Sequence, residues 1–327
     1  MFKALVLNQE DKKTLVSIEQ LDESQLPEGD VLIDVDYSSL NYKDGLAITG
    51  KGRIVRQFPM VPGIDLTGTV VESADARYTA GDKVVLTGWG VGEGHWGGMA
   101  ERARLKADWL VPLPSNLDGK QTMMIGTAGI TAMLCVQALV DAGIKPESGE
   151  ILVTGASGGV GSVAVTLLSQ LGYNVVAVTG RIAENGELLK SLGATRVVER
   201  SEFAEPARPL DKQLWAGAID TVGSNMLARV LSQVDYDGAV AICGLAGGFD
   251  LPTTVMPFIL RNVKLLGIDS VMCPFEKRQK AWQRLGELLP ASFFEQACRE
   301  VALEDVAECA EAITNGQITG RVVIKLK

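Results

Sequence analysis

Histidine is nearly absent from this sequence, because His95 is the single histidine among 327 residues. A catalytic zinc ion needs three protein ligands drawn from histidine, cysteine and acidic side chains, and no cysteine lies close to His95 along the chain. We therefore expect no metal site. A Ser-His-Asp hydrolase would depend on the same residue. A lone histidine in a glycine-rich segment is better interpreted as a structural residue than as a general base.

Cysteine is also scarce. The five cysteines are odd in number, scattered and free of Cys-X-X-Cys spacing, which is typical of reduced thiols in a cytosol rather than of a disulfide framework. No apolar run of about 18 uncharged residues is expected to cross a membrane, and the N-terminus lacks the apolar stretch and cleavage site of a signal peptide. These absences predict a cytoplasmic protein.

Positive charge is in deficit, since 31 lysines and arginines face 40 aspartates and glutamates, for a net charge of −9. Nucleic acids and anionic membranes bind dominant basic surfaces, so neither is expected as a partner. An anionic ligand must instead meet local cations. Hydrophobic residues make up 46% of the chain, which excludes general disorder, and 327 residues exceed the usual size of one core. Two domains are therefore expected.

The first third of the chain is predicted to be β-rich. Val31 to Val35 alternates apolar and acidic residues, and prolines and glycines break the following segment into short strands. Near Leu117 the pattern changes, and Thr122 to Val140 predicts a buried helix that ends at Asp141 to Gly143.

Short β-branched runs then alternate with helical patterns, which predicts an α/β domain with a doubly wound parallel sheet. The predicted strands are Ile151 to Val153, Val175 to Val178, Arg196 to Val198, Ala218 to Val222, Ala239 to Cys243 and Leu265 to Ile268. A helix is expected around Glu304 to Thr314, followed by a final strand, Arg321 to Leu326, that rejoins the N-terminal domain. The expected domains are residues 1–122, completed by about 270–327, and residues 123–269.

A glycine-rich turn joins the first of these strands to a helix. The sequence Ile151-Leu-Val-Thr-Gly-Ala-Ser-Gly-Gly-Val-Gly161 leads directly into an apolar helical pattern. Glycines allow the backbone to approach a pyrophosphate, whose charge is stabilised by the free N–H groups and the dipole of the new helix. The turn therefore predicts a dinucleotide site. Gly92 to Gly97 also fits G-X-G-X-X-G, but no strand, helix and strand follow it, so we interpret it as a structural turn or a substrate-side loop.

The choice between NAD and NADP depends on the end of the second strand, about 20 residues later, where NAD enzymes place an acidic residue against the ribose hydroxyls. Here Val178 leads into Thr179-Gly180-Arg181. A hydroxyl and a guanidinium can bind a 2′-phosphate through charge-assisted hydrogen bonds. NADPH is therefore the expected cofactor.

Without a metal, the reaction needs hydride from a nicotinamide and another way to stabilise charge on a substrate oxygen. Reduction of a C=C bond next to a carbonyl group meets this requirement. Hydride adds to the β carbon, an enolate forms, and the α carbon takes a proton from a donor or from water.

Several motifs resemble those of one known family. They are Ser39-Leu-Asn-Tyr-Lys-Asp44, Pro59-Met-Val-Pro-Gly-Ile-Asp65, Gly88-Trp-Gly-Val-Gly-Glu93 with His95-Trp-Gly-Gly98, Ile125-Gly-Thr-Ala-Gly129 and Asp269-Ser-Val-Met-Cys-Pro274. Over nearly its whole length, the chain resembles the medium-chain dehydrogenase/reductase superfamily and, within it, the acryloyl-CoA reductase group of quinone-oxidoreductase-like proteins. Zinc-dependent relatives carry a cysteine in place of the Asn41-Tyr42 segment and Gly-His-Glu in place of Gly63-Ile64-Asp65.

The resemblance implies a barrel-like GroES-type catalytic domain, a Rossmann domain, a cleft between them and a homodimer. It also implies a set of cofactor contacts. Tyr42 would lie against the nicotinamide, and Leu245, Ile259 and Ser270 would line the same half of the cofactor. The pyrophosphate would contact Ser157, Gly158, Gly159 and Val160, and the 2′-phosphate would contact Thr179, Gly180 and Arg181. Arg200 would lie on the adenosine side, and Asn315 is a looser match to a cofactor contact.

Two further hypotheses concern catalysis and substrate. Tyr42 is the candidate that donates a proton or a hydrogen bond to the enolate, with cofactor or substrate packing as its alternative role. Asp44 is better interpreted as a structural acid than as a base. Coenzyme A carries phosphates, and the basic residues Arg53 and Arg56 near Tyr42 are candidates to bind them, with a solvated basic loop as the alternative.

Three functions therefore stay open from the sequence. The favoured one is NADPH-dependent reduction of a short 2-enoyl-CoA, acryloyl-CoA to propanoyl-CoA above all. The second is an NADPH:quinone or enone reductase, whose substrate lacks the thioester tail. The third is a non-catalytic NADPH-binding protein.

Overall fold

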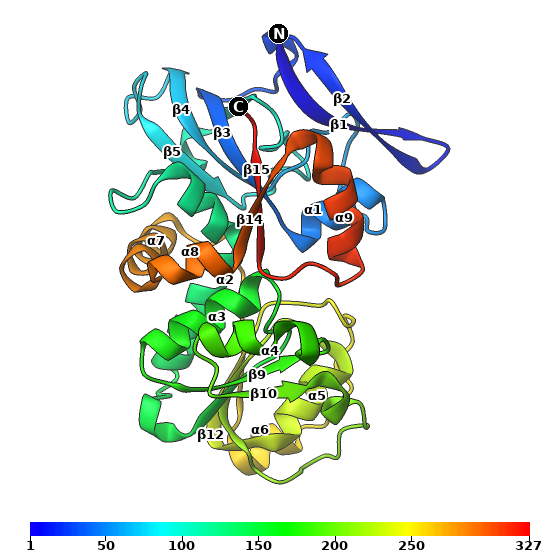
Figure 1. Cartoon of the computed structure of the whole chain (residues 1–327), viewed down its shortest axis with the longest axis vertical. Helices are drawn as coiled ribbons and strands as arrows, with labels where there is room; N and C mark the ends of the chain where they lie inside the picture. Colours follow the sequence, from blue (N-terminus) through cyan, green and yellow to red (C-terminus); the bar gives the residue numbers. More distant parts are fainter. The chain divides into compact units, whose positions relative to one another are not determined.

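The computed structural model describes residues 1–327 and divides the chain into two units (Figure 1). The first unit comprises Met1–Thr127, Ser270–Glu287 and Cys298–Lys327. The second comprises Ala128–Asp269 and Leu288–Ala297.

The first unit is built on a seven-stranded sheet with the order β14-β15-β3-β4-β5-β7, to which β6 adds by pairing with β3. A separate hairpin, β1–β2, extends from it as an arm (Figure 1). The strands are β1 (Phe2–Glu10), β2 (Lys13–Leu21), β3 (Val31–Leu40), β4 (Asp65–Ser73), β5 (Lys83–Thr87), β6 (Arg102–Leu105), β7 (Leu110–Pro112), β14 (Cys298–Ala302) and β15 (Arg321–Lys325). The helices are α1 (Tyr42–Thr49), α7 (Phe275–Leu288) and α9 (Val306–Thr314), and α2 (Gly119–Asp141) starts in this unit.

The predicted alternation of β3 is confirmed from Ile33 to Asp36, whereas Leu32 is buried as well. Val31, Ile33 and Val35 are fully buried in the core of the first unit, while Asp34 and Asp36 lie toward solvent. Successive side chains of a strand point to opposite faces, so this pattern places one face on the core. The last strand, β15, pairs antiparallel with β3, so the end of the chain belongs to the sheet that its first third begins.

Helix α2 corrects one expectation. By length and composition this helix is long and apolar enough to cross a membrane, although no such segment was expected from the sequence. In the structure, however, 72% of its most apolar window is buried inside the protein, as in the core helix of a soluble domain. The helix also begins at Gly119, three residues before the predicted start, and its geometry is interrupted at Gly126.

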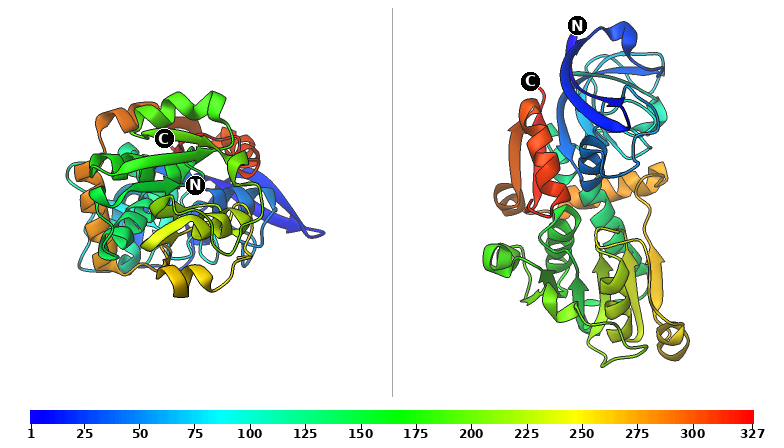
Figure 2. Two further views of the ribbon diagram at one scale, coloured as in Figure 1. Left: turned by 90° about the horizontal axis from the view of Figure 1, so that it is seen from below. Right: turned by 90° about the vertical axis from the view of Figure 1, so that its right-hand side faces the viewer.

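The second unit contains the predicted doubly wound sheet. Six parallel strands have the order β10-β9-β8-β11-β12-β13, with α3 and α4 on one face and α5 on the other (Figure 2). The chain reverses direction across the sheet between β8 and β11, where open parallel sheets bind their ligands. The strands are β8 (Glu150–Val153), β9 (Asn174–Thr179), β10 (Arg196–Glu199), β11 (Trp215–Asp220), β12 (Val234–Ile242) and β13 (Lys264–Gly267). The helices are α3 (Gly159–Gln170), α4 (Ile182–Ser191), α5 (Ser224–Gln233), α6 (Met256–Arg261) and α8 (Ala291–Gln296).

Most strand boundaries differ from the prediction by one residue, and those of β11 and β12 differ by more. Strand β11 ends at Asp220 rather than Val222, because the N–H groups of Val222 and Gly223 turn back to the Asp220 carboxylate. Strand β12 starts at Val234 rather than Ala239. The turn signal Asp237-Gly238 lies inside that strand, where Asp237 has a φ of 64°.

Candidate functional site

The glycine-rich turn of the second unit has the predicted form of an anion site. Gly155 has a φ of 58°, and a Cβ atom on Gly161 would lie 2.3 Å from the Gly155 carbonyl oxygen, so neither position accepts a side chain. Helix α3 begins at Gly159, directly after Gly158. The Gly158 N–H donates to the Gly155 carbonyl at 3.0 Å. The half-buried residues Gly159 and Val160 carry N–H groups of the first helical turn, which have no partner within the helix.

The end of β9 gathers hydroxyl and guanidinium groups beside this turn. The Ser157 and Thr179 hydroxyl oxygens are 3.2 Å apart, and the Arg181 N–H donates to the Thr179 hydroxyl at 3.2 Å. A Cβ atom on Gly180 would lie 2.9 Å from Cζ of Arg200, so the Arg200 guanidinium occupies the space that the glycine leaves. No acidic residue ends the strand. The arrangement offers hydroxyls and two cations to a phosphate group.

A buried carboxylate supports the same turn from β11. Asp220 accepts from the Thr154 hydroxyl at 2.7 Å and from the Gly223 N–H at 2.7 Å. The Thr221 hydroxyl donates in return to the Thr154 carbonyl at 3.0 Å. Burial raises the pKa of Asp220 above its ordinary value, while its hydrogen bonds lower it. The sequence analysis missed this residue, although an acid at the end of an apolar strand is a signal for it.

Two other predicted cofactor contacts of the second unit are exposed. Leu245 lines a cavity of about 450 Å³ at the carboxyl ends of β12 and β13, together with Cys243, Ile268 and Asp269. Ile259, on α6, is 70% exposed. Neither side chain is held in the core of its own unit, so both are available to contact a ligand.

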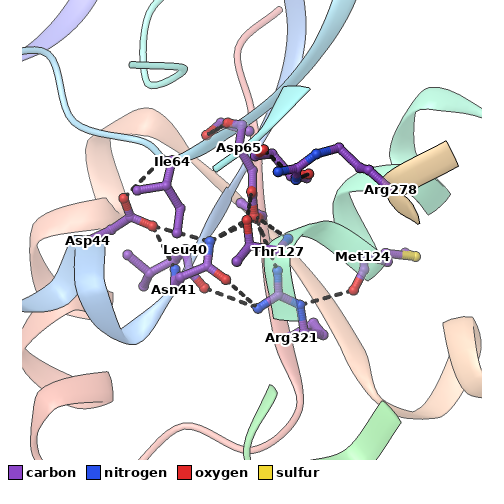
Figure 3. Close-up of polar contacts among 12 residues, drawn as sticks. Leu40, Asn41, Asp44, Ile64, Asp65, Met124, Thr127, Arg278 and Arg321 are labelled. Atoms are coloured by element: carbon purple, nitrogen blue, oxygen red, sulfur yellow. Dashed lines mark hydrogen bonds and ion pairs between the residues drawn. The ribbon is translucent and has the colours of Figure 1, made fainter. Parts of the chain in front are cut away.

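Tyr42, the candidate catalytic residue, is the first residue of α1 and is 37% exposed. The start of this helix is held by the buried Asp44 carboxylate, which accepts the Asn41 N–H at 2.9 Å and the Ile64 N–H at 3.0 Å (Figure 3). Asp44 therefore links the Asn41-Tyr42 segment to the Pro-Gly-Ile motif that precedes β4.

A second buried carboxylate, that of Asp65, joins three elements of the first unit. It accepts from the Ser39 hydroxyl at 2.6 Å, the Asn41 side-chain amide at 2.8 Å and the Thr127 N–H at 2.9 Å (Figure 3). The Thr127 hydroxyl donates as well, at 2.5 Å. Arg321 lies 3.9 Å from the same carboxylate.

Arg321 comes from β15 and is also buried. Its guanidinium donates to the Met124 carbonyl at 3.0 Å, the Asn41 side-chain oxygen at 3.1 Å and the Ser39 hydroxyl at 3.0 Å. Desolvation lowers the pKa of this arginine, whereas the charge of Asp65 raises it. Sequence reasoning missed Arg321, although a charged residue beside the apolar Val-Val-Ile of the last strand is a usable signal.

One cation thus faces two buried carboxyl groups. Burial raises the pKa of Asp44 to about 7, with the nearby charge of Asp65 as the second cause. The hydrogen bonds from Asn41 and Ile64 oppose this shift. A carboxyl group with a pKa near neutral pH therefore lies in the first turn of the helix that begins at Tyr42.

The remaining predicted site residues of the first unit are Ser270, Asn315, Arg53 and Arg56. Ser270 is 9% exposed and lies on the loop that precedes α7. The exposed Asn315 ends α9, and its side-chain oxygen accepts from Lys51 at 3.3 Å. Arg53 is exposed without an ion pair, while Arg56 is 74% exposed and lies 3.7 Å from Glu93.

His95 has structural partners. Its two ring nitrogens lie 2.9 Å from the Trp96 carbonyl oxygen and 3.2 Å from that of Glu28, and its ring packs edge-on against Trp109 at 5.1 Å. No group of three or more histidine, cysteine, aspartate or glutamate side chains is placed to hold a metal ion. The Gly92 to Gly97 segment forms turns, without the helix that follows the turn at Gly158.

Two family models match the chain. The "Alcohol dehydrogenase GroES-like domain" model matches residues 27–115, and the "Zinc-binding dehydrogenase" model matches residues 159–288. The first range falls on the β-rich part of the first unit. The second covers β9 to β13 of the parallel sheet and continues through α7.

Curated relatives are similar over the full chain. A probable acrylyl-CoA reductase AcuI of Escherichia coli is 65% identical over 99% of both chains, and the acrylyl-CoA reductase AcuI of Ruegeria pomeroyi is 54% identical over 99% of both. The solved structure of the E. coli K-12 protein YhdH with bound NADPH is 65% identical, covers 99% of this chain and 100% of its own, and has a TM-score of 0.98. The chain therefore belongs to the medium-chain dehydrogenase/reductase superfamily and, within it, to the acrylyl-CoA reductase group of quinone-oxidoreductase-like proteins.

Proposed function

We propose that this protein is an NADPH-dependent reductase of short 2-enoyl-CoA thioesters, with acrylyl-CoA as substrate and propanoyl-CoA as product. The observation that carries the proposal is the identity of 65% and 54%, over the whole chain, to two proteins named acrylyl-CoA reductase. At such identity the motifs that surround Tyr42 and the glycine turn are expected to serve the same chemistry.

The groups at the end of β9 suit NADPH rather than NADH. Thr179 and Ser157 supply hydroxyls, and Arg181 and Arg200 supply the cations that a 2′-phosphate requires. The first turn of α3 binds the pyrophosphate through its backbone N–H groups. Leu245, Ile259, Ser270 and Asn315 are proposed as further contacts of the cofactor.

NADPH bound in this way supplies the hydride, which adds to the β carbon of the enoyl thioester. The C=C π electrons move toward the thioester oxygen, and the resulting enolate takes a proton at its α carbon. Tyr42 is proposed to donate its hydroxyl hydrogen to this enolate, as a hydrogen bond or as the proton itself. The partly exposed position of Tyr42 at the start of α1 leaves that hydroxyl free to meet substrate.

Arg53 and Arg56 are proposed to bind phosphates of the coenzyme A part. Of the three cations between residues 51 and 56, Lys51 is already paired with Glu311 at 2.6 Å. Arg53 has no acidic partner, and the contact of Arg56 with Glu93 is long. These two arginines are therefore the cations that can turn to an anionic ligand in this acidic protein.

The remaining proposals concern the whole protein. We propose that it works in the cytoplasm, as a homodimer and without a metal ion. The absence of metal is checked by dialysis against a strong chelator, which should leave the turnover number unchanged.

The substrate class is tested by following NADPH oxidation with acrylyl-CoA, crotonyl-CoA and a benzoquinone in parallel, with NADH as the control cofactor. The proposal expects acrylyl-CoA to have the highest kcat/KM, and NADPH to be preferred over NADH. Turnover of the quinone alone would instead assign the protein as a quinone reductase. Absence of turnover with all three would indicate a non-catalytic NADPH-binding protein.

The coenzyme A contacts are tested with Arg53→Glu and Arg56→Glu. Each should raise the KM for acrylyl-CoA by roughly threefold to fivefold, as expected for an exposed charge pair, and leave the KM for an uncharged enone unchanged. Arg208→Glu, at an exposed arginine of the second unit, is the matched control. An unchanged KM for acrylyl-CoA in both variants would remove these arginines from the site.

A further inference from the structure

The turn after β5 has an unusual backbone. Gly88, Trp89 and Gly90 all have positive φ angles, of 83°, 60° and 72°. Glycine adopts such angles at little cost, but a bulky residue does so at a cost of roughly 1–3 kcal/mol. Trp89 must therefore be held in this conformation by its surroundings.

Three contacts hold the turn. The Trp89 N–H donates to the Val271 carbonyl at 3.0 Å, and the Gly88 N–H donates to the Ile64 carbonyl at 3.1 Å. A Cβ atom on Gly88 would lie 2.9 Å from the Val271 carbonyl oxygen, so the two loops approach too closely for a side chain. The third contact is Arg278, whose guanidinium carbon lies 5.0 Å from the centre of the Trp89 ring.

Arg278 connects this turn to the loop before α7. One guanidinium nitrogen donates to the Thr87 carbonyl at 2.7 Å and to the Thr87 hydroxyl at 2.8 Å. The other donates to the carbonyls of Ser270, Val271 and Cys273 at 3.1, 3.1 and 3.3 Å. Figure 3 shows Arg278 reaching the strand end beside Asp65.

Burial makes this arrangement costly for a residue that serves folding alone. Arg278 is 1% exposed, and moving a charged group out of water costs several kcal/mol unless hydrogen bonds compensate for it. An apolar residue at this position of α7 would continue the buried face of Ala281, Trp282 and Leu285. Arg278 instead donates hydrogen bonds to backbone carbonyls at the end of β5 and in the loop before α7.

The held turn lies next to the Tyr42 segment. The Ile64 N–H donates to Asp44 at the start of α1, and the Ile64 carbonyl accepts from Gly88. Both anchors are therefore backbone groups of one residue, Ile64. Trp89 is only half-buried, and its indole N–H has no hydrogen-bond partner.

We propose that Trp89 determines the acyl-chain length that the enzyme accepts, and that Arg278 is the positioning residue that holds Trp89 in place. This inference rests on the proposed function. In this proposal the exposed part of the indole faces the acyl chain, where it leaves room for a vinyl group and meets any longer chain. Its rigidity depends on the Arg278 guanidinium that packs over the ring.

The test compares kcat/KM for crotonyl-CoA and acrylyl-CoA in Trp89→Phe, Arg278→Lys and the unsubstituted protein. Trp89→Phe should raise the ratio of crotonyl-CoA to acrylyl-CoA by about tenfold, the usual lower bound for one methyl group in an apolar pocket. Arg278→Lys, whose ammonium cannot span Thr87 and all three loop carbonyls, should raise the ratio in the same direction. Trp109→Phe, at a half-buried tryptophan of the same unit, is the control and should leave it unchanged.

The outcomes separate the inference from the function on which it rests. A purely structural role for Arg278 would lower Tm and reduce both rates equally, without moving the ratio, and would overturn its positioning role. An unchanged ratio in Trp89→Phe, or an equal shift in Trp109→Phe, would overturn the role of Trp89. Failure of the unsubstituted protein to reduce acrylyl-CoA would contradict the proposed function itself.

Discussion

The residue that most distinguishes the first unit is Asp44, a buried acid that shares one arginine with a second buried acid. Arg321 lies nearer to Asp65 and hydrogen-bonds to Ser39 and Asn41, which themselves donate to Asp65. Asp44 is left with backbone and amide donors only. Its raised pKa follows from that unequal division of charge, since burial penalises the ionised form and the neighbouring carboxylate adds to the penalty.

Asp44 should make the stability of the protein depend on pH in a defined direction. Because its pKa rises from 3.8 to about 7 on folding, the native state keeps a proton that the unfolded state has released between these values. The stability that this group contributes is complete below about pH 4 and is lost as the pH rises through 7.

The measurement is urea unfolding of the wild-type protein and of Asp44→Asn at a series of pH values. The wild-type protein should lose stability relative to the variant as the pH rises across this window. A stability difference that stays constant with pH would show that Asp44 is ionised throughout.

Tyr42→Phe should lower kcat for acrylyl-CoA by roughly 100-fold, because the variant removes one hydroxyl from a proton-donating position. The dissociation constant of NADPH, measured by fluorescence titration, should change little, since the aromatic ring remains. Tyr236→Phe, at a tyrosine that is 69% exposed on the second unit, serves as the control. A kcat within twofold of the wild-type value would assign Tyr42 to packing alone.

Individual site residues were predictable only where a local pattern carries them. Tyr42, Ser157 and Thr179 stand in contiguous motifs, so their neighbours in sequence identify them. Arg278 and Arg321 act on residues that lie far away along the chain. Their roles arise from tertiary placement, which no local spacing encodes.

At the scale of elements, α2 is the informative case. The helix breaks at Gly126, whose φ of 51° and ψ of −160° are open almost only to glycine. The Asp65 carboxylate accepts the N–H and hydroxyl of Thr127, directly after the break, and so caps the second part of the helix. The same carboxylate also holds the segment before α1.

Gly126→Ala should therefore be strongly destabilising. A Cβ atom there would lie 2.5 Å from the Asp65 carboxylate, 2.6 Å from the Arg321 guanidinium and 2.9 Å from the Ser39 hydroxyl. We expect a loss of roughly 3 kcal/mol or more, from backbone strain together with overpacking.

Gly143→Ala is the matched control, because Gly143 has a φ of 91° but no atom within 4 Å of its Cβ position. It should cost only the backbone strain, about 1–2 kcal/mol. The free energy of unfolding in urea measures both variants. Equal losses would show that the contacts around Gly126 can relax.

Elements with regular periodicity were predictable from sequence, and their ends were not. The alternation of β3 and the six strands of the parallel sheet follow from the spacing of apolar residues. The end of β11 depends on the Asp220 carboxylate, and the break in α2 depends on three side chains from other elements. The motif Ile125 to Gly129 is visible in the sequence, but the need for glycine at position 126 arises from those tertiary contacts.

At the scale of the whole molecule, an acidic chain concentrates cations where anions are expected. Arg181 and Arg200 flank the end of β9 in the second unit, and Arg53 and Arg56 are exposed in the first. Cysteine thiols with raised pKa values include those of Cys298 and Cys309. Burial raises the pKa of Cys298 to about 12 and also raises that of Cys309, which disfavours the thiolate form of both. Weakly nucleophilic thiols suit an enzyme whose proposed substrate is itself an electrophile.

The central claim is hydride transfer to the β carbon of an enoyl thioester, and isotope labelling tests it most directly. The protein is incubated with acrylyl-CoA and NADPH deuterated at the transferable position of the nicotinamide, and the product is analysed by NMR and mass spectrometry. The account predicts propanoyl-CoA with one deuterium on the β carbon and a solvent-derived hydrogen on the α carbon. Deuterium on the α carbon, or a product with no deuterium, would contradict it.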